Sequence, residues 1–122
     1  NRLHNALEPL GDLLILPEAA ENSIPSWFGF VISTHPDSGL DRNKITAYME
    51  ECNIQTRLLF SGNLIKHPCF DQIRGTEAYR VIGELKNTDY IMNNTFWIGV
   101  YPGMTDNMID YMAQSLRKIV IS

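Results

Sequence analysis

Three short apolar runs constrain the fold of this chain more than any other feature. They extend from Trp27 to Thr34, from Ile54 to Phe60 and from Thr95 to Tyr101, and turn-forming residues follow each of them. Runs of this length and composition predict β-strands. In the first and third runs both alternating sets of residues are apolar, which predicts strands that are covered on both faces.

The segments around these runs predict helices. Asp41 and Thr105 are each placed to cap a helix, because their side chains can accept hydrogen bonds from the free amides of a first helical turn. Thr88 is predicted to cap a shorter helical turn. Near the start, leucines recur at helical spacing from Arg2 to about Leu14, and a proline and a glycine inside this segment are expected to end or kink the helix.

The order of helices and strands predicts an α/β (α+β) chain, with a small three-stranded, mainly antiparallel sheet and helices packed on one face. The 122 residues and the hydrophobic content of 44% suit one domain, residues 1–122, with one core. The other face of the sheet would be unusually apolar if it met only water, which indicates a missing partner domain. We therefore expect an excised piece of a longer protein, in which residues 1–16 are the tail of a longer helix.

Charge and cysteine content argue against several classes of function. The formal net charge of −4 disfavours nucleic acid or anionic lipid as the main partner. No apolar run is long enough to span a bilayer and no signal peptide is visible, so we expect a cytoplasmic protein without a membrane partner. Cys52 and Cys69 do not make a disulfide scaffold, and their wide spacing does not predict a zinc site.

The stretch that begins at Arg57 gathers the side chains best suited to chemistry. The Arg57 guanidinium can hold a carboxylate or phosphate with two parallel hydrogen bonds, or it can form a structural ion pair. Ser61, Gly62 and Asn63 can present backbone amides and short polar groups to an anion or a sugar hydroxyl, or they can form a plain turn. His67 can move protons or contact a phosphate, or it can serve only in packing.

Three segments carry a specific combination of residues. The first is Ser26-Trp27-Phe28-Gly29-Phe30. The second is Asn53-Ile54-Gln55-Thr56-Arg57-Leu58-Leu59-Phe60-Ser61-Gly62-Asn63-Leu64, with His67-Pro68-Cys69-Phe70 after it. The third is Asn87-Thr88-Asp89 with Thr95-Phe96-Trp97-Ile98-Gly99-Val100-Tyr101-Pro102-Gly103-Met104. With these segments the chain resembles, over nearly its whole length, the C-terminal small domain of the DegT-type sugar aminotransferase family. Members of this family have the fold-type-I aspartate aminotransferase fold. Within the family the likeness is greatest to the 3-dehydrases that act on CDP-4-dehydro-6-deoxyglucose in lipopolysaccharide dideoxysugar synthesis.

The resemblance implies that the cofactor is anchored outside this chain. Members of the family hold pyridoxal or pyridoxamine phosphate on a preceding large domain, through a lysine in the aminotransferases and with a histidine in its place in the dehydrases. The cofactor is the electron sink when the 3-hydroxyl of a nucleotide-linked 4-keto-6-deoxy sugar is lost, and protein groups supply orientation and proton transfer. Some members add an iron–sulfur cluster and a separate reductase. The two cysteines here do not provide the four thiolates of such a cluster, which would lie upstream.

The resemblance also implies that this domain forms one wall of a substrate site, with no catalytic, cofactor-binding or metal-binding residue of its own. The predicted substrate contacts are Arg57, Ser61, Gly62, Asn63 and His67. Fold-type-I aminotransferases use a small-domain arginine for the carboxylate of the amino donor. A dehydrase has no amino donor, so a nucleotide-phosphate contact and a structural ion pair both stay open for Arg57.

Three functions remain open from the sequence. The first is a dehydrase fragment that works with its own large domain, in a parent that the family predicts to be a homodimer. The second is a nucleotide-sugar aminotransferase of the same family, because the lysine-or-histidine position lies outside this chain. The third is a free-standing small α/β binding module that dimerises through an exposed sheet. The upstream sequence and the residue at the anchoring position would separate them.

Overall fold

The computed structural model describes residues 2–122. The helices are α1 (Arg2–Leu7), α2 (Arg42–Glu51), α3 (Lys86–Asn94) and α4 (Asp106–Ile121), with 3-10 helices at Glu8–Leu10, Leu64–Lys66 and Pro68–Ile73. The strands are β1 (Leu14–Ile15), β2 (Phe30–Thr34), β3 (Thr56–Leu58) and β4 (Thr95–Ile98). All strands pair antiparallel, in the order β1-β2-β4-β3. The sheet therefore has four strands, and the prediction of three was wrong in this detail.

The additional strand lies in the segment that was expected to be helical. Helix α1 ends at Leu7, and the chain passes through one 3-10 turn before β1 pairs with the end of β2, Leu14 opposite Thr34. The helix cannot continue because Pro9 lacks an amide hydrogen and clashes with the preceding turn. Since β1 has only two residues, it has no periodicity that a sequence could reveal. Asn1 lies outside the described residues, so the predicted helix tail 1–16 is described from Arg2 onward.

Two of the three predicted helix caps are confirmed. Asp41 Oδ1 accepts from a backbone amide in the first turn of α2 at 2.8 Å, and Thr105 Oγ1 accepts from one in the first turn of α4 at 3.3 Å. Thr88 lies inside α3, which begins at Lys86, so its predicted capping role is wrong.

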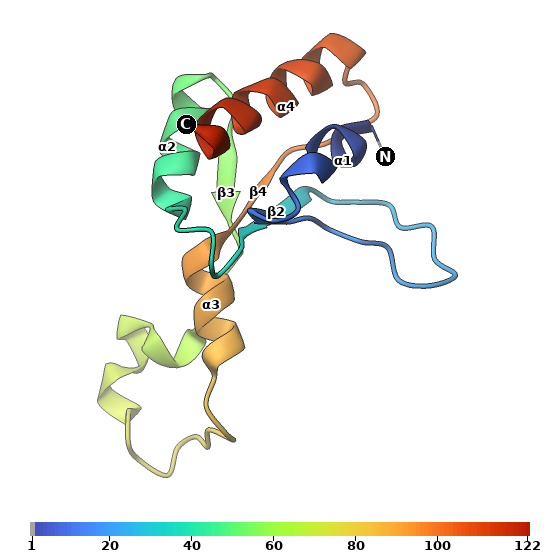
Figure 1. Cartoon of the computed structure of the whole chain (residues 1–122). Coiled ribbons are helices and arrows are strands. Elements are labelled where there is room, and N and C mark those ends of the chain that lie inside the picture. Colours follow the sequence, from blue (N-terminus) through green and yellow to red (C-terminus); the bar gives the residue numbers. More distant parts are fainter. Residues whose placement is uncertain (1) are drawn as a thin grey trace.

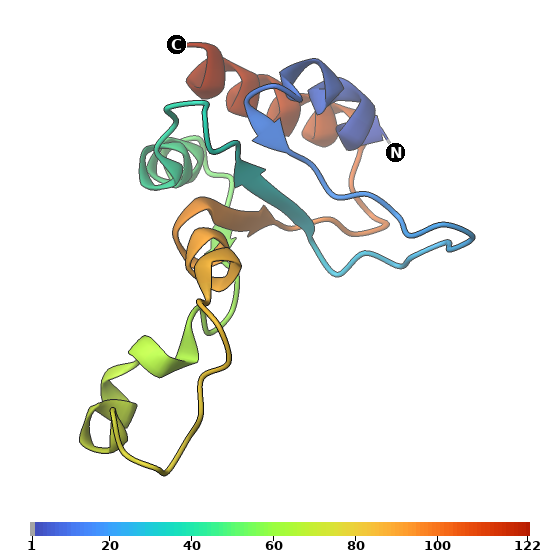
Figure 2. The same ribbon diagram turned by 60° about the horizontal axis from the view of Figure 1, so that its bottom comes forward.

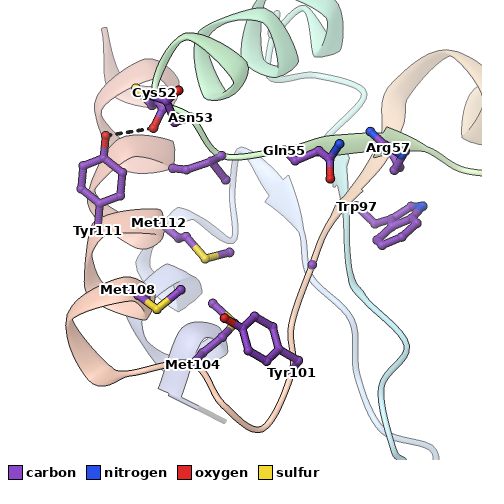
Figure 3. A pocket seen from close by; sticks show the side chains of 12 residues that line it. Cys52, Asn53, Gln55, Arg57, Trp97, Tyr101, Met104, Met108, Tyr111 and Met112 are labelled. Carbon is purple, nitrogen blue, oxygen red and sulfur yellow. Dashed lines mark hydrogen bonds between the residues drawn. The ribbon is translucent and has the colours of Figure 1, made fainter.

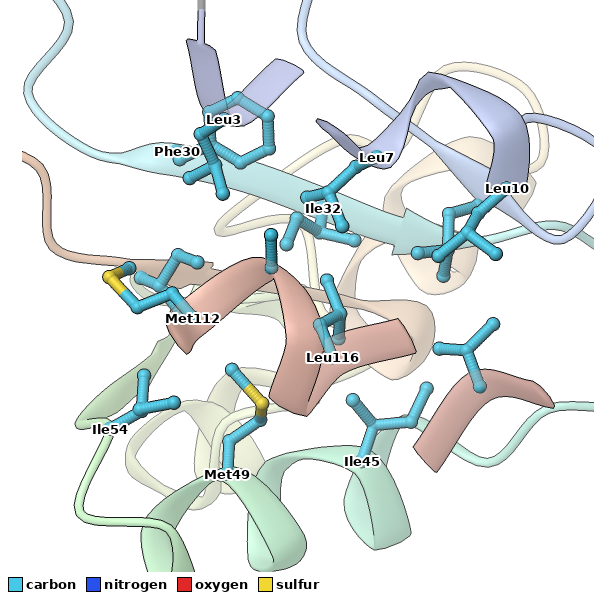
Figure 4. Packing of buried hydrophobic residues seen from close by; sticks show 14 of the residues in the cluster. Leu3, Leu7, Leu10, Phe30, Ile32, Ile45, Met49, Ile54, Met112 and Leu116 are labelled. Atoms are coloured by element: carbon cyan, nitrogen blue, oxygen red, sulfur yellow. The ribbon is translucent and has the colours of Figure 1, made fainter. Parts of the chain in front are cut away.

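Helices α1, α2 and α4 enclose the hydrophobic core against one face of the sheet (Figure 4). Leu7, Ile45 and Leu116 come from the three helices, Ile32 and Phe96 come from β2 and β4, and none of the five is more than 1% exposed. Fully burying a side chain of this kind stabilises a fold by about 1.5–3 kcal/mol. This core holds the sheet, and with it β3, in one place.

The opposite face of the sheet is not covered by α1, α2 or α4, and α3 lies beyond the end of the sheet where β4 begins (Figures 1 and 2). Val31 and Trp97 point to this open face and are only half-buried. Within the described chain the strands are therefore covered on one face, although both faces were expected to be covered. The partner domain that the apolar strands indicated stays a prediction.

Two segments project from this body (Figures 1 and 2). One is the loop of residues 16–29 between β1 and β2, and the other is residues 59–85 between β3 and α3, which we call the arm. The strand predicted from Ile54 to Phe60 is shorter in the structure, from Thr56 to Leu58, so the arm already begins at residue 59. No helix of the described residues is long and apolar enough to cross a membrane.

Candidate functional site

Arg57 lies on the open face of the sheet, on the edge strand β3, directly across from Trp97 of β4. Its side chain is exposed, and no carboxylate of residues 2–122 pairs with it. The structural ion pair that the sequence left open is thus not formed within the described chain. The guanidinium keeps its capacity to bind an anion.

The two residues that precede Arg57 in the chain hold its guanidinium in position. Arg57 Nη1 donates to the backbone carbonyl of Thr56 at 3.0 Å. With its amide in the orientation that satisfies both ends, Gln55 Oε1 accepts from Arg57 Nη2 at 2.7 Å and from Nη1 at 3.0 Å. A guanidinium fixed by neutral acceptors retains its full charge and loses less rotamer freedom when it binds an anion. Gln55 was not among the residues predicted to form the site.

The start of β3 is fixed by a carboxylate from the end of α2. Glu50 Oε1 accepts from the Thr56 amide at 2.6 Å and from Thr56 Oγ1 at 2.8 Å. These hydrogen bonds, first that from the backbone amide and then that from the hydroxyl, lower the pKa of Glu50, and the charge of Arg57 lowers it further. Asn53 takes the left-handed conformation between the two elements, at φ 58°.

A groove of about 660 Å³ opens beside Arg57, where β3 and β4 diverge over the first half of α4 (Figure 3). Gln55, Arg57 and Trp97 lie at one end, and the remaining wall is mainly apolar, with methionines and tyrosines that include Met108 and Tyr111. The Tyr111 hydroxyl donates to the Cys52 carbonyl at 3.0 Å and closes the far side. The volume lies within the range of small-molecule sites. This groove was not predicted, because its residues come from two stretches that are far apart in the chain, 52–57 and 97–112.

The turn of Ser61, Gly62 and Asn63 forms the base of the arm and packs against α3. Gly62 has φ 63°, and a Cβ there would lie 2.7 Å from Met92 Cγ, so this position requires glycine. Asn63 is buried, and its Nδ2 donates to Asp89 Oδ1 at 2.8 Å. The turn is thus part of a fixed base, and Ser61 is its exposed member.

Asp89 joins the arm to α3 by two contacts. Lys66 Nζ lies 2.7 Å from Asp89 Oδ1, the atom that also accepts from Asn63. The Lys66 hydrogen bond, and then that from Asn63, hold the pKa of Asp89 below its usual value. Lys66 therefore serves to anchor the arm.

His67 lies between the two 3-10 helices of the arm, and its Nε2 donates to the carbonyl of Ser61. The structure thus brings four predicted residues together at the base of the arm, Ser61, Gly62, Asn63 and His67. Arg57 stands apart on the sheet, and no hydrogen bond among residues 2–122 joins it to them.

The described residues do not fit pyridoxal phosphate. The cofactor needs a lysine or histidine beside its reactive carbon together with a cradle for its phosphate. Lys44 is exposed on α2, Lys66 pairs with Asp89, and Lys86 pairs with Glu84. Lys118 lies 6.0 Å from the ring centroid of Tyr48, and all four lysines are at the surface. Residues 2–122 also contain no group of three or more metal-ligating side chains, and both cysteines are free.

Fold and site together define a two-layer α+β domain that carries an exposed arginine, a groove beside it and an anchored arm. The chain belongs to the DegT/DnrJ/EryC1/StrS aminotransferase family, whose pattern it matches over residues 1–117.

Two curated relatives share nearly half of their aligned residues with the chain. It is 47% identical over 116 residues to the lipopolysaccharide biosynthesis protein RfbH of Salmonella typhimurium, covering 95% of this chain and 26% of that protein. It is also 47% identical over 119 residues to the dTDP-4-dehydro-2,6-dideoxy-D-glucose 3-dehydratase of Saccharopolyspora spinosa, covering 98% of this chain and 25% of that protein. The chain thus spans about a quarter of the length of these relatives.

Solved structures share the fold. The Escherichia coli GDP-4-keto-6-deoxy-D-mannose-3-dehydratase with bound hydrated PLP superimposes with a TM-score of 0.78 at 23% identity, over 94% of this chain and 28% of that chain. DesV of S. venezuelae, in complex with a ketimine intermediate, gives a TM-score of 0.75 at 15% identity, over 99% of this chain and 30% of that chain. The fold class predicted from the sequence is confirmed.

Proposed function

We propose that this chain is the C-terminal small domain of a nucleotide-sugar 3-dehydratase that removes the 3-hydroxyl of a 4-keto-6-deoxyhexose in dideoxysugar and lipopolysaccharide biosynthesis. The observation that carries the proposal is the 47% identity, over nearly the whole chain, to a relative named as a 3-dehydratase and to one named for lipopolysaccharide biosynthesis. The open arginine beside a groove supports it, because a nucleotide sugar carries a diphosphate.

In this proposal each residue of the site has a defined task. Arg57 binds the diphosphate of the substrate, held ready by Gln55. Ser61 and the backbone at Gly62 contact the substrate at the base of the arm. Asn63 fixes this turn through its hydrogen bond to Asp89. His67 contacts phosphate or passes a proton through its second ring nitrogen, since Nε2 is already bound.

Pyridoxal or pyridoxamine phosphate supplies the electron sink of such a reaction when bound, and the proposal places it on the rest of the protein. The residues of this chain bind and orient the substrate. A homodimeric parent, a separate reductase, an upstream iron–sulfur cluster and a cytoplasmic location are further proposals about that larger protein. The cysteines of this chain do not supply the ligands of such a cluster.

A nucleotide-sugar aminotransferase is the second candidate, favoured by the family itself and by the aminotransferases that share the fold. A histidine at the cofactor-anchoring position of the full-length protein supports the dehydratase, and a lysine supports the aminotransferase. The products separate them as well, because a dehydratase removes oxygen from carbon 3 and an aminotransferase replaces the keto oxygen with an amine.

Substitution of Arg57 in the full-length protein tests the proposal. Arg57→Ala should raise the KM for the nucleotide sugar by about tenfold or more. This is the change expected from losing one charge-assisted contact, which contributes about 1.5–3 kcal/mol. Arg57→Lys should recover part of this loss, because a lysine keeps the charge without the bidentate geometry. Steady-state kinetics with a check of folding by circular dichroism measures both.

Arg117→Ala is the matched control, since Arg117 is an exposed arginine on α4. It should leave KM and kcat unchanged. Wild-type kinetics in a folded Arg57→Ala protein would remove the assigned role of Arg57.

A further inference from the structure

An aromatic cluster on the open face of the sheet has no place in the core. It consists of Phe28, Phe60 and Trp97. The ring centroids of Phe28 and Trp97 are 5.2 Å apart with planes tilted by 51°, and those of Phe28 and Phe60 are 6.4 Å apart with planes tilted by 34°. Phe28 and Phe60 are each 76% exposed. Rings held in contact with one another but left open to solvent mark a binding surface.

Both projecting segments join the sheet at this cluster. Phe28 lies at the end of the loop 16–29 and Phe60 at the beginning of the arm, so two distant parts of the chain each contribute a ring. Phe60 has φ 33°, a conformation that is costly for a large side chain. Strain of this kind persists where surrounding contacts impose it, and here it directs an aromatic ring toward the cluster.

Trp97 forms the floor of the cluster because residue 29 has no side chain. A Cβ on Gly29 would lie 2.4 Å from Cε3 of the indole, so the ring occupies the space that a side chain would fill. Directly across from Trp97 on β3 is Arg57. Facing residues of paired strands have their Cβ atoms about 4.5–5.5 Å apart. A planar aromatic surface and a cation therefore lie side by side.

A ligand that fits this surface would bring a flat π system for the rings and an anionic group for Arg57. A nucleobase joined to phosphate has both, whereas a pyranose ring has no π system.

We propose that the aromatic cluster binds the nucleobase of the nucleotide-linked substrate while Arg57 binds its diphosphate. The inference rests on the proposed function, since it assumes a nucleotide sugar as the substrate. Stacking does not depend on the identity of the base, because every base has a π face. The cluster therefore supplies affinity, and groups elsewhere select the base.

Binding of CDP, dTDP, GDP and inorganic diphosphate to the full-length protein, followed by isothermal titration calorimetry, tests the proposal. Phe28→Leu and Phe60→Leu keep apolar volume and remove the ring. Each substitution should lower the affinity for the three nucleoside diphosphates by about tenfold, equivalent to about 1.4 kcal/mol. The affinity for inorganic diphosphate should stay within about twofold of the wild-type value. Arg57→Ala should lower the affinity for the nucleoside diphosphates and for inorganic diphosphate.

Two further variants separate stacking from packing. Phe28→Tyr keeps the ring and should bind like the wild type. Phe70→Leu makes the same change at an exposed phenylalanine of the arm outside the cluster, and should also bind like the wild type.

Nucleoside diphosphate affinities within about twofold of the wild type in both leucine variants would overturn the proposal. An equal loss for inorganic diphosphate would overturn it too, and so would an equal loss with tyrosine at position 28, which would assign the rings to packing against another part of the protein. The proposed function fails separately, if the wild-type full-length protein turns over no nucleotide sugar while the nucleotide titrations still respond to the ring.

Discussion

Arg57 forms few interactions within the described chain. Its side chain contacts a neutral amide and a backbone carbonyl, and no carboxylate of the described chain pairs with it. Sequence reasoning found this residue, because an arginine inside an apolar strand is unusual. It did not find Gln55 as the acceptor that holds the guanidinium, because a glutamine two positions earlier on an exposed strand has no distinctive pattern.

At the same scale, Gly29→Ala should destabilise the chain by about 1–3 kcal/mol, the usual cost of inserting atoms into filled space. The added Cβ would meet Trp97 Cε3 at 2.4 Å, and the indole would have to move. Denaturant unfolding followed by circular dichroism measures the change. Gly99→Ala is the matched control, because a Cβ there meets nothing within 4 Å. Equal stability of the two variants would contradict this account of Gly29.

At the scale of elements, the arm projects away from the core (Figures 1 and 2). Its base is attached through Asn63, Lys66 and Asp89, and its distal part carries exposed apolar side chains such as Ile82. The sequence predicted a turn at Ser61, Gly62 and Asn63. It did not show that the Asn63 side chain would be buried against α3, since Asp89 lies 26 residues away.

The attachment of the arm should depend on pH through Asp89. Its pKa is lower in the folded chain than the usual 3.8, so its contribution is complete above 3.8 and is lost as the pH falls through the lowered value. Hydrogen exchange of residues 61–67, corrected for intrinsic rates, should show severalfold lower protection at pH 3 than at pH 5.

Asp89→Asn should lower this protection at pH 5 and remove most of its further decline. Glu84→Gln is the control, because Glu84 is an exposed carboxylate whose one ion pair within residues 2–122 is with Lys86. A wild-type pH profile in Asp89→Asn would show that another group holds the arm.

In the whole molecule, the helices of residues 2–122 cover only one face of the sheet (Figure 1). The core is closed between the helices and the sheet. Both projecting segments extend away from it (Figure 2), and the groove opens at its edge (Figure 3). Nothing among the described residues is shaped to hold pyridoxal phosphate, and the lysines that pair do so at the surface.

The chain of 122 residues should therefore not bind pyridoxal phosphate specifically. Added cofactor should give only the absorbance of nonspecific lysine adducts, unchanged by Lys66→Ala. The full-length protein, measured in parallel, should bind it stoichiometrically. Stoichiometric binding by the chain alone would show that the cofactor site has been assigned to the wrong part of the protein.

The sequence alone determined the local structure, the fold class and the family. The caps at Asp41 and Thr105 depend on interactions between near neighbours. Local runs of apolar residues mark the positions of β2, β3, β4 and the buried helix faces, so these are visible in a linear sequence as well. Only the tertiary structure decided the rest. The two-residue β1, the burial of Asn63, the acceptor for Arg57 and the cluster around Trp97 depend on which distant segments meet. Those meetings are set by packing against one shared core, which no local pattern encodes.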